Sequence, residues 1–151
     1  MPTITVPSPF GPLSITEHEG HIVALNWCAA DDNQSTPLLE EAKTQMAAYF
    51  ASELKKFDLP LAPTGNKFQQ DVCNAMLDIP YGETCTYGDI ANLLGTYGQP
   101  VGQACGGNTI PIISPCHRVL ATGGLGGYSG EGGVERKIAL LKHEGGYPYL
   151  L

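Results

Sequence analysis

The sequence is poor in basic residues and has no long hydrophobic run. It contains 8 lysines and arginines against 15 aspartates and glutamates, which gives a formal net charge of −7 at pH 7. A protein that binds nucleic acid mainly by neutralising phosphates has the opposite charge balance, so this mode of binding is disfavoured. No apolar stretch approaches the roughly 20 residues of a membrane-spanning helix, and residues 1–4 lack the features of a signal peptide. We therefore expect a soluble, cytoplasmic protein with no membrane partner.

The five cysteines are widely spaced and include no Cys-x-x-Cys pair. An odd number of separated cysteines argues against a disulfide framework, and the lack of paired thiols argues against a structural zinc site. We expect free thiols, no bound metal, and at least one cysteine that is available for catalysis.

The first part of the chain has the pattern of a small α/β domain. Alternating segments at residues 3–6, 13–16 and 21–28 predict β-strands. From Thr36, which can cap a helix, the hydrophobic period changes to that of a helix that ends near residues 54–56. The apolar face of that helix would contain Leu39, Ala42, Met46, Tyr49 and Phe50. Residues 1–58 are therefore expected to form an α/β N-terminal domain, with a short antiparallel sheet and one helix.

Residues 59–63 are proline-rich and predict a linker, because proline cannot continue a helix. The remainder, residues 64–151, predicts a mostly α C-terminal domain that begins with a helix from Thr64 to about Leu77. Two shorter helices follow, one at Tyr87–Leu94 and one that opens at Pro100. Because a glycine-containing turn separates them, they have the shape of a helix-turn-helix.

Local signals mark several helix ends in this second domain. Thr86 and Asp89 have the spacing of a capping box, and Gly145 ends a final helix predicted from Val134 to about His143. The apolar residues expected to face inward are Ile90, Leu93 and Leu94 in the first short helix, and Val134, Ile138 and Leu141 in the last.

Cys116 lies between an apolar segment and the glycine-rich loop 123–133, so its thiol would be partly enclosed but reachable. The thiolate is the reactive form of cysteine, and a neighbouring imidazole favours it. Adjacent residues in extended chain point apart, so a water molecule is expected to bridge His117 and Cys116. Such a base needs an orienting partner, for which Glu144 is a candidate. Taken alone, the pair also fits a structural cysteine beside a core histidine.

A wider set of motifs accompanies this cysteine. The decisive run is Ser114-Pro115-Cys116-His117-Arg118-Val119, and it occurs with Ile79-Pro80-Tyr81-Gly82-Glu83-Thr84, Thr86-Tyr87-Gly88-Asp89-Ile90-Ala91, Gly127-Tyr128-Ser129-Gly130 and Leu140-Leu141-Lys142-His143-Glu144-Gly145. In order and spacing these motifs resemble the O6-alkylguanine-DNA alkyltransferases over residues 64–145. The resemblance implies a winged-helix-like helix-turn-helix that binds double-stranded DNA in the minor groove, and a monomeric protein. It also implies irreversible, single-turnover transfer of a methyl or small alkyl group from guanine O6 to cysteine, without a cofactor, after the damaged nucleotide is flipped out.

The resemblance assigns catalytic roles to five residues. Cys116 matches the alkyl acceptor, which His117 activates through water while Glu144 orients the histidine. Tyr87 matches the tyrosine whose phenol serves guanine N3, so that guanine leaves as a neutral species. Asn108 matches the asparagine that ties the helix-turn-helix to the active-site loop.

Further residues match substrate and DNA contacts. The backbone at Cys116 and Val119 would accept a hydrogen bond from the exocyclic amine of guanine, and Tyr128 and Ser129 match the loop that covers the base. Arg118 is expected to anchor the active-site loop. The residues expected to contact DNA are Thr86, Gln99, Pro100, Gln103 and Ala104.

The sequence departs from the family pattern where DNA would be held. Gln99 stands where the family has an arginine that enters the base stack, and no Lys or Arg occurs between Lys67 and Arg118. We therefore expect weak and salt-sensitive binding to DNA. One alternative is a relative that senses damage or acts on another alkylated substrate, although retention of Cys116 favours repair. A second alternative is a cysteine hydrolase that uses Cys116 and His117.

Overall fold

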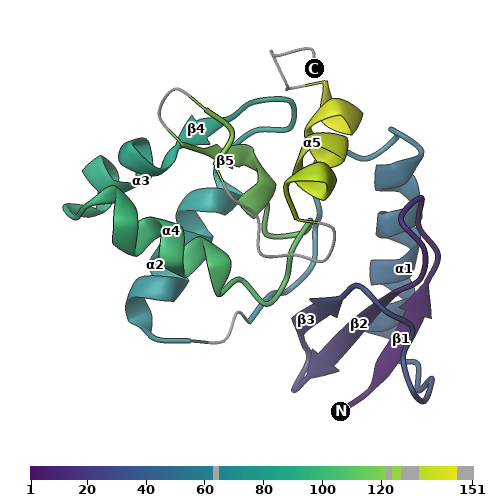
Figure 1. The fold of residues 1–151 in the computed structure, drawn as a ribbon. Coiled ribbons are helices and arrows are strands. Elements are labelled where there is room, and N and C mark those ends of the chain that lie inside the picture. The colour runs from purple at the N-terminus through teal and green to yellow at the C-terminus, as the bar shows by residue number, and fades with distance from the viewer. Residues whose placement is uncertain (63–64, 122–123, 127–132, 146–151) are drawn as a thin grey trace. The chain divides into compact units, whose positions relative to one another are not determined.

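The computed structural model describes residues 1–62, 65–121, 124–126 and 133–145. The chain divides into two compact units, residues 1–63 and 64–151, and each is described by itself (Figure 1). The expected fold class is confirmed: an antiparallel sheet with one helix comes first, and a mostly helical part follows.

The first unit is a three-stranded antiparallel sheet covered by a helix. Its strands lie in the order β1 (Thr3–Val6), β2 (Leu13–His18) and β3 (His21–Asn26), and α1 (Pro37–Phe50) packs against β1 and β2. In this register Ile15 lies opposite both Ile4 and Leu25, so one face of the sheet buries a continuous apolar layer. Glu19 and Gly20, both with positive φ, form the two-residue turn between β2 and β3.

Local capping determines where α1 begins. The Thr36 hydroxyl accepts a hydrogen bond from the Leu39 amide at 3.1 Å, and the predicted apolar face is buried at Leu39, Ala42, Met46 and Tyr49. The helix ends at Phe50, several residues before the predicted end, because Ser52 adopts a φ of 61° and turns the chain away.

The expected linker 59–63 belongs to the first unit. The Ile22 amide donates to the Pro60 carbonyl at 2.8 Å, and the Ala62 amide donates to the Ile22 carbonyl at 2.9 Å. Proline lacks an N–H but keeps its carbonyl, so this segment adds a short parallel bridge to β3 through Leu61.

The described residues of the second unit form four helices and two very short strands. In chain order its elements are α2 (Lys67–Leu77), β4 (Cys85–Thr86), α3 (Tyr87–Leu94), α4 (Gly98–Gly106), a 3₁₀ turn (Cys116–Arg118), β5 (Val119–Leu120) and α5 (Gly133–Glu144). Helices α2, α3 and α4 share one apolar core, and α3 and α4 form the expected helix-turn-helix. None of the helices within the described ranges has the length and hydropathy of a bilayer-spanning segment.

Capping boxes fix the starts of α2 and α3. Thr86 and Asp89 form the predicted box at α3. At α2 an unpredicted box pairs Asn66 with Gln69, so the helix begins at Lys67 and not at Thr64. Helix α4 begins at Gly98, two residues before Pro100, which therefore lies in the first turn, where a missing N–H is tolerated.

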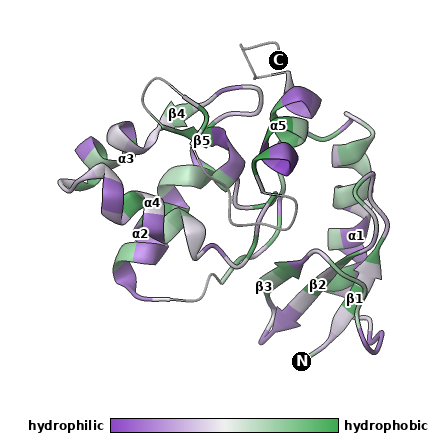
Figure 2. Cartoon of the chain, in the orientation of Figure 1, coloured by the Kyte–Doolittle hydropathy of each residue, from purple (hydrophilic) through white to green (hydrophobic). Residues whose placement is uncertain are grey.

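Two inward-facing predictions are wrong. Leu93 is 71% exposed, because α3 turns Ile90 and Ala91 towards the core instead. Val134 is 41% exposed, because the buried face of α5 is rotated relative to the predicted one. That face contains Lys137, Leu140, Leu141 and Glu144. Figure 2 shows hydrophobic and hydrophilic residues on both helices.

Candidate active site

Cys116 opens the 3₁₀ turn that leads into β5 and is only 7% exposed. Strand β5 pairs with β4 in parallel, with Val119 opposite Cys85 and Leu120 opposite Thr86. Because Thr86 is followed directly by α3, this small sheet connects the cysteine turn to the start of the helix-turn-helix.

His117 and Glu144 form a fully buried pair. The His117 Nε2 atom lies 2.8 Å from Glu144 Oε2. Burial lowers the pKa of His117 below its ordinary value, and the glutamate opposes this effect. The imidazole is therefore neutral at pH 7, with its proton on Nε2 facing the carboxylate. The other ring nitrogen, Nδ1, is buried and has no hydrogen-bond partner among the described residues, so it is available as a proton acceptor.

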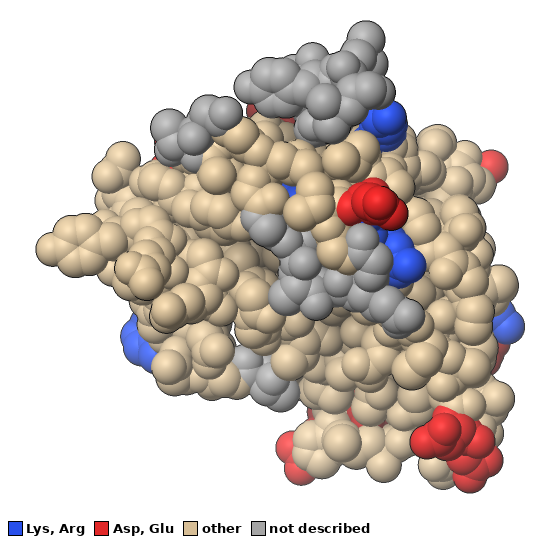
Figure 3. Space-filling model, in the orientation of Figure 1, with Lys and Arg blue, Asp and Glu red and all other residues tan. Residues whose placement is uncertain are grey.

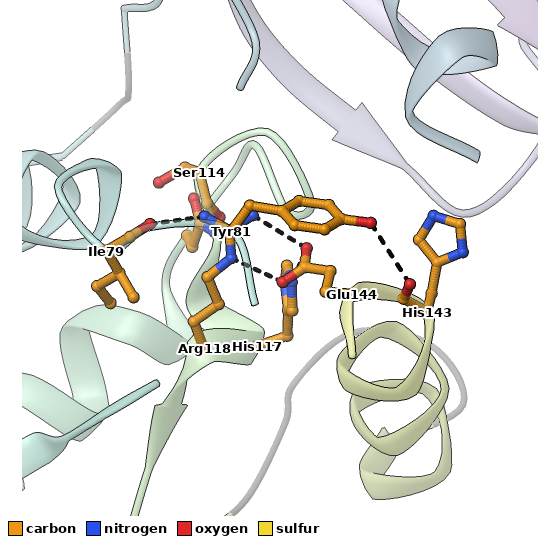
Figure 4. A network of polar contacts seen from close by, with 8 residues as sticks. Ile79, Tyr81, Ser114, His117, Arg118, His143 and Glu144 are labelled. Carbon is orange, nitrogen blue, oxygen red and sulfur yellow. Dashed lines mark hydrogen bonds and ion pairs between the residues drawn. The ribbon is translucent and has the colours of Figure 1, made fainter. Parts of the chain in front are cut away.

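Arg118 holds the same carboxylate from the other side (Figure 4). Its Nε donates to Glu144 Oε1 at 2.8 Å, and its Nη2 donates to Oε2 at 3.0 Å. Its Nη1 donates to the Ile79 carbonyl at 2.7 Å, and the guanidinium lies 5.8 Å from the ring centroid of Tyr81. The bidentate geometry fixes the end of α5 against the cysteine turn, and Glu144 is thereby oriented for His117.

Asn108 connects the end of α4 to the segment before Cys116. Its Nδ2 donates to the Ser114 carbonyl at 2.8 Å, and its Oδ1 accepts from the Ile110 amide at 3.1 Å. The Ser114 hydroxyl also lies 3.1 Å from the thiol of Cys73 on α2. Between these hydrogen-bonded residues Ile112 adopts a φ of 71°. This backbone conformation is strained for a β-branched residue, so surrounding contacts must stabilise it.

Tyr87 is the first residue of α3, is half-buried, and packs against the apolar cluster that contains Cys116. Burial raises the pKa of its phenol, and negative charge at Cys105 or Cys116 would raise it further, so the hydroxyl keeps its proton at neutral pH. Gly126 approaches it closely: a Cβ there would lie 3.3 Å from the phenol oxygen. On the other side, a Cβ at Gly98 would lie 3.8 Å from the Tyr87 Cβ.

Lys137 is a site residue that the sequence reasoning missed. It is fully buried, its Nζ donates to the Val119 carbonyl at 2.7 Å, and it lies 5.7 Å from the ring centroid of Tyr87. Burial lowers its pKa to about 8, while negative charge at Cys116 would raise it. The sequence does contain an indication that Lys137 faces inward. It precedes Leu140, Leu141 and Glu144 by three, four and seven residues, which is the spacing of residues on one face of a helix.

The expected DNA-contacting residues do not all lie on the surface. Gln99 and Gln103 are exposed on α4, and Pro100 is half-buried. The Thr86 side chain caps α3, and Ala104 is buried in the core shared by the three helices. Tyr128 and Ser129 lie outside the described residues. Within the described ranges, no group of three or more His, Cys, Asp or Glu side chains is arranged to hold a metal ion.

Two family models together match nearly the whole chain. One is the ribonuclease-like domain of 6-O-methylguanine DNA methyltransferase, which matches residues 3–63, and the other is the DNA binding domain of the same protein, which matches residues 67–146. The chain belongs to the O6-methylguanine DNA methyltransferase family. The resemblance drawn from the sequence motifs is thus confirmed.

Individual members of the family are similar over almost their full length. A methylated-DNA–protein-cysteine methyltransferase of Methanosarcina acetivorans is 43% identical over 149 residues, which cover 91% of this chain and 94% of that protein. One from Mycobacterium tuberculosis is 45% identical over 150 residues, which cover 93% and 90%. The crystal structure of Mycobacterium tuberculosis OGT in complex with DNA aligns with a TM-score of 0.86 at 41% identity and covers 96% of this chain and 93% of that one.

Proposed function

We propose that this protein repairs double-stranded DNA by moving a methyl or small alkyl group irreversibly from guanine O6 to the sulfur of Cys116. The observation that carries the proposal is the buried series of Cys116, His117 and Glu144, in which the histidine keeps Nδ1 as a proton acceptor. The similarity to methylated-DNA–protein-cysteine methyltransferases, and to a relative in complex with DNA, supports the same reaction.

Each side chain has a defined part in the transfer. The Cys116 thiol gives its proton through a bridging water to Nδ1 of His117, and Glu144 stabilises the imidazolium that forms. The thiolate then attacks the alkyl carbon, a carbon–sulfur bond forms, and the bond from that carbon to O6 breaks. Its electron pair passes into the guanine, and the phenol of Tyr87 supplies a proton to N3. The product is a neutral guanine and a stable thioether, so each molecule reacts once.

The buried position of Cys116 requires that the damaged nucleotide leave the base stack. A guanine inside a duplex presents O6 in the groove and cannot bring it to the sulfur of a residue that is only 7% exposed. The nucleotide must therefore rotate into the protein, past Tyr87 at the start of the helix-turn-helix.

Turnover distinguishes this proposal from a cysteine hydrolase. In an excess of duplex DNA that contains O6-methylguanine, demethylation should stop at one methyl group per protein molecule. Continued release of product beyond one equivalent would indicate hydrolysis. Binding of the modified duplex without any loss of its methyl group would indicate a protein that only senses damage.

Replacing Lys137 with methionine should slow the transfer about tenfold at pH 7. The buried cation favours the thiolate at Cys116, and methionine keeps the length of the side chain but not the charge. Because Lys137 has a pKa of about 8, it loses its own charge above that pH, and the difference between wild type and variant should narrow there. Single-turnover rates from pH 7 to 10 measure this effect, and Lys142→Met on the exposed side of α5 is the control. A rate ratio that does not change with pH would contradict this role.

Replacing Gln99 with arginine should speed the reaction with duplex DNA at limiting protein concentration. Gln99 is exposed in the first turn of α4, in a stretch that has no Lys or Arg from residue 68 to residue 117. One new phosphate contact should steepen the dependence of log K on log salt by about 0.9. The control is Gln34→Arg, which changes the net charge equally from an exposed position in the first unit. An unchanged rate and salt slope for Gln99→Arg would show that this position does not reach DNA.

A further inference from the structure

Tyr97 is the most exposed large hydrophobic side chain among the described residues of the second unit. It is 80% exposed, compared with 71% for Leu93 and 41% for Val134. Tyr97 stands at the N-cap of α4 with its backbone extended, and its side chain makes no capping hydrogen bond. Neither helix capping nor burial therefore explains an aromatic residue at this turn, because burial of the Tyr97 side chain contributes almost nothing to the stability of the fold.

The turn that carries Tyr97 adjoins the candidate active site. The next residue, Gly98, lies against Tyr87, since a Cβ at Gly98 would be 3.8 Å from the Tyr87 Cβ. Tyr87 in turn lies beside Lys137, whose carbonyl partner, Val119, follows the cysteine turn. A nucleotide that enters past Tyr87 would therefore leave its duplex close to Tyr97.

Residues 95–98, which form the α3–α4 turn, include no charged side chain. No Lys or Arg occurs from residue 68 to residue 117, and on the face drawn in Figure 3 the surface over the α3–α4 turn shows no charged side chain. When a nucleotide is extruded, a protein group that occupies the gap hinders the return of the base to the stack. Without a cation, the groups suited to this task are flat or apolar side chains that insert between base steps or stack on them.

We propose that Tyr97 enters the base stack of the duplex and holds the gap from which the nucleotide is extruded. The inference rests on one step of the proposed function, the extrusion of the base, because only that step needs such a wedge. The phenol ring supplies a π face for either neighbouring base and needs no particular base sequence. The exposed Gln99, two residues further along α4, remains free to hydrogen-bond at the same opening.

The test compares Tyr97→Ala, Tyr97→Phe and wild type on two substrates under single-turnover conditions. One is a duplex with one O6-methylguanine, and the other is the same modified strand alone, which has no paired stack to hold open. Tyr97→Ala should react with the duplex on the order of ten- to a hundredfold more slowly, in line with the loss of one stacking contact. Tyr97→Phe should keep most of the wild-type rate, and the single-strand rate should change far less. Leu93→Ala, at the other exposed apolar position of the helix-turn-helix, is the matched control.

A second readout separates failure of this inference from failure of the proposed function. A 2-aminopurine placed next to the modified guanine brightens when its neighbour leaves the stack, whether or not transfer follows. Wild-type protein should increase this fluorescence and Tyr97→Ala should not. A full increase with Tyr97→Ala, a duplex rate within twofold of wild type, or equal losses on both substrates would overturn the role of Tyr97. Absence of transfer from both substrates, with a fluorescence increase that depends on Tyr97, would overturn the proposed function and leave the wedge standing.

Discussion

Cys116→Ser should slow methyl transfer by on the order of 10³-fold or more and leave the fold intact. The thiolate is the nucleophile, and a serine hydroxyl at the same position ionises far less readily and attacks an alkyl carbon far more slowly. The measurement is the single-turnover rate with duplex DNA that contains O6-methylguanine, and circular dichroism shows that the variant is folded.

Two other cysteines provide matched controls for this variant. Cys28 is exposed in the first unit, and burial raises the pKa of Cys85 to about 11, so its thiol stays protonated at neutral pH. Cys28→Ser and Cys85→Ser should therefore keep the wild-type stoichiometry. Transfer of a full equivalent to Cys116→Ser would remove Cys116 from the mechanism.

Glu144→Ala should lose about 3–5 kcal/mol of the free energy of unfolding, because it leaves a buried guanidinium without its counter-ion. The carboxylate accepts three hydrogen bonds, one from His117 and two from Arg118, and all three side chains are buried. Glu144→Gln should lose less stability, because its amide oxygen still accepts one hydrogen bond. Both variants should also react more slowly at temperatures where they are folded, because the imidazolium formed at His117 is no longer stabilised.

Urea unfolding with an unchanged m-value measures the first effect, and single-turnover rates measure the second. Glu135→Gln, an exposed glutamate on the same helix, should change stability by less than about 0.5 kcal/mol. A Glu144→Ala protein as stable and as fast as wild type would show that the network around this carboxylate neither holds the turn nor assists His117.

Features set by neighbouring residues could be predicted from the sequence, and those set by distant contacts could not. The caps at Thr36 and Thr86 involve residues three positions apart, so their signal is complete within the local sequence. Strands β4 and β5 have two residues each and too little length for any period, although their pairing joins the cysteine turn to Tyr87. The pairing of residues 60–62 with Ile22 joins segments far apart in the sequence, so no local pattern predicts it.

Site residues that belong to a sequence motif could be predicted. Site residues whose position depends on which face of a helix is buried could not. Cys116, His117 and Glu144 belong to such motifs, and the structure brings His117 and Glu144 to 2.8 Å. The sequence pattern does not indicate Lys137, because an inner face that includes Val134 is rotated relative to the observed face of α5. A buried lysine contradicts the hydrophobic pattern on which that prediction relied, and its hydrogen bond to the Val119 carbonyl offsets the cost of burying it.

Peptide mapping after reaction with DNA tests the central claim most directly. The protein is incubated with a duplex that carries one O6-methylguanine, its intact mass is measured, and the methylated peptide is then sequenced by mass spectrometry. The account predicts a gain of one methyl group, located on Cys116, with matching loss of the methyl group from the DNA. An unchanged mass from folded protein whose Cys116 thiol still reacts with a small alkylating reagent, or a methyl group on another residue, would contradict it.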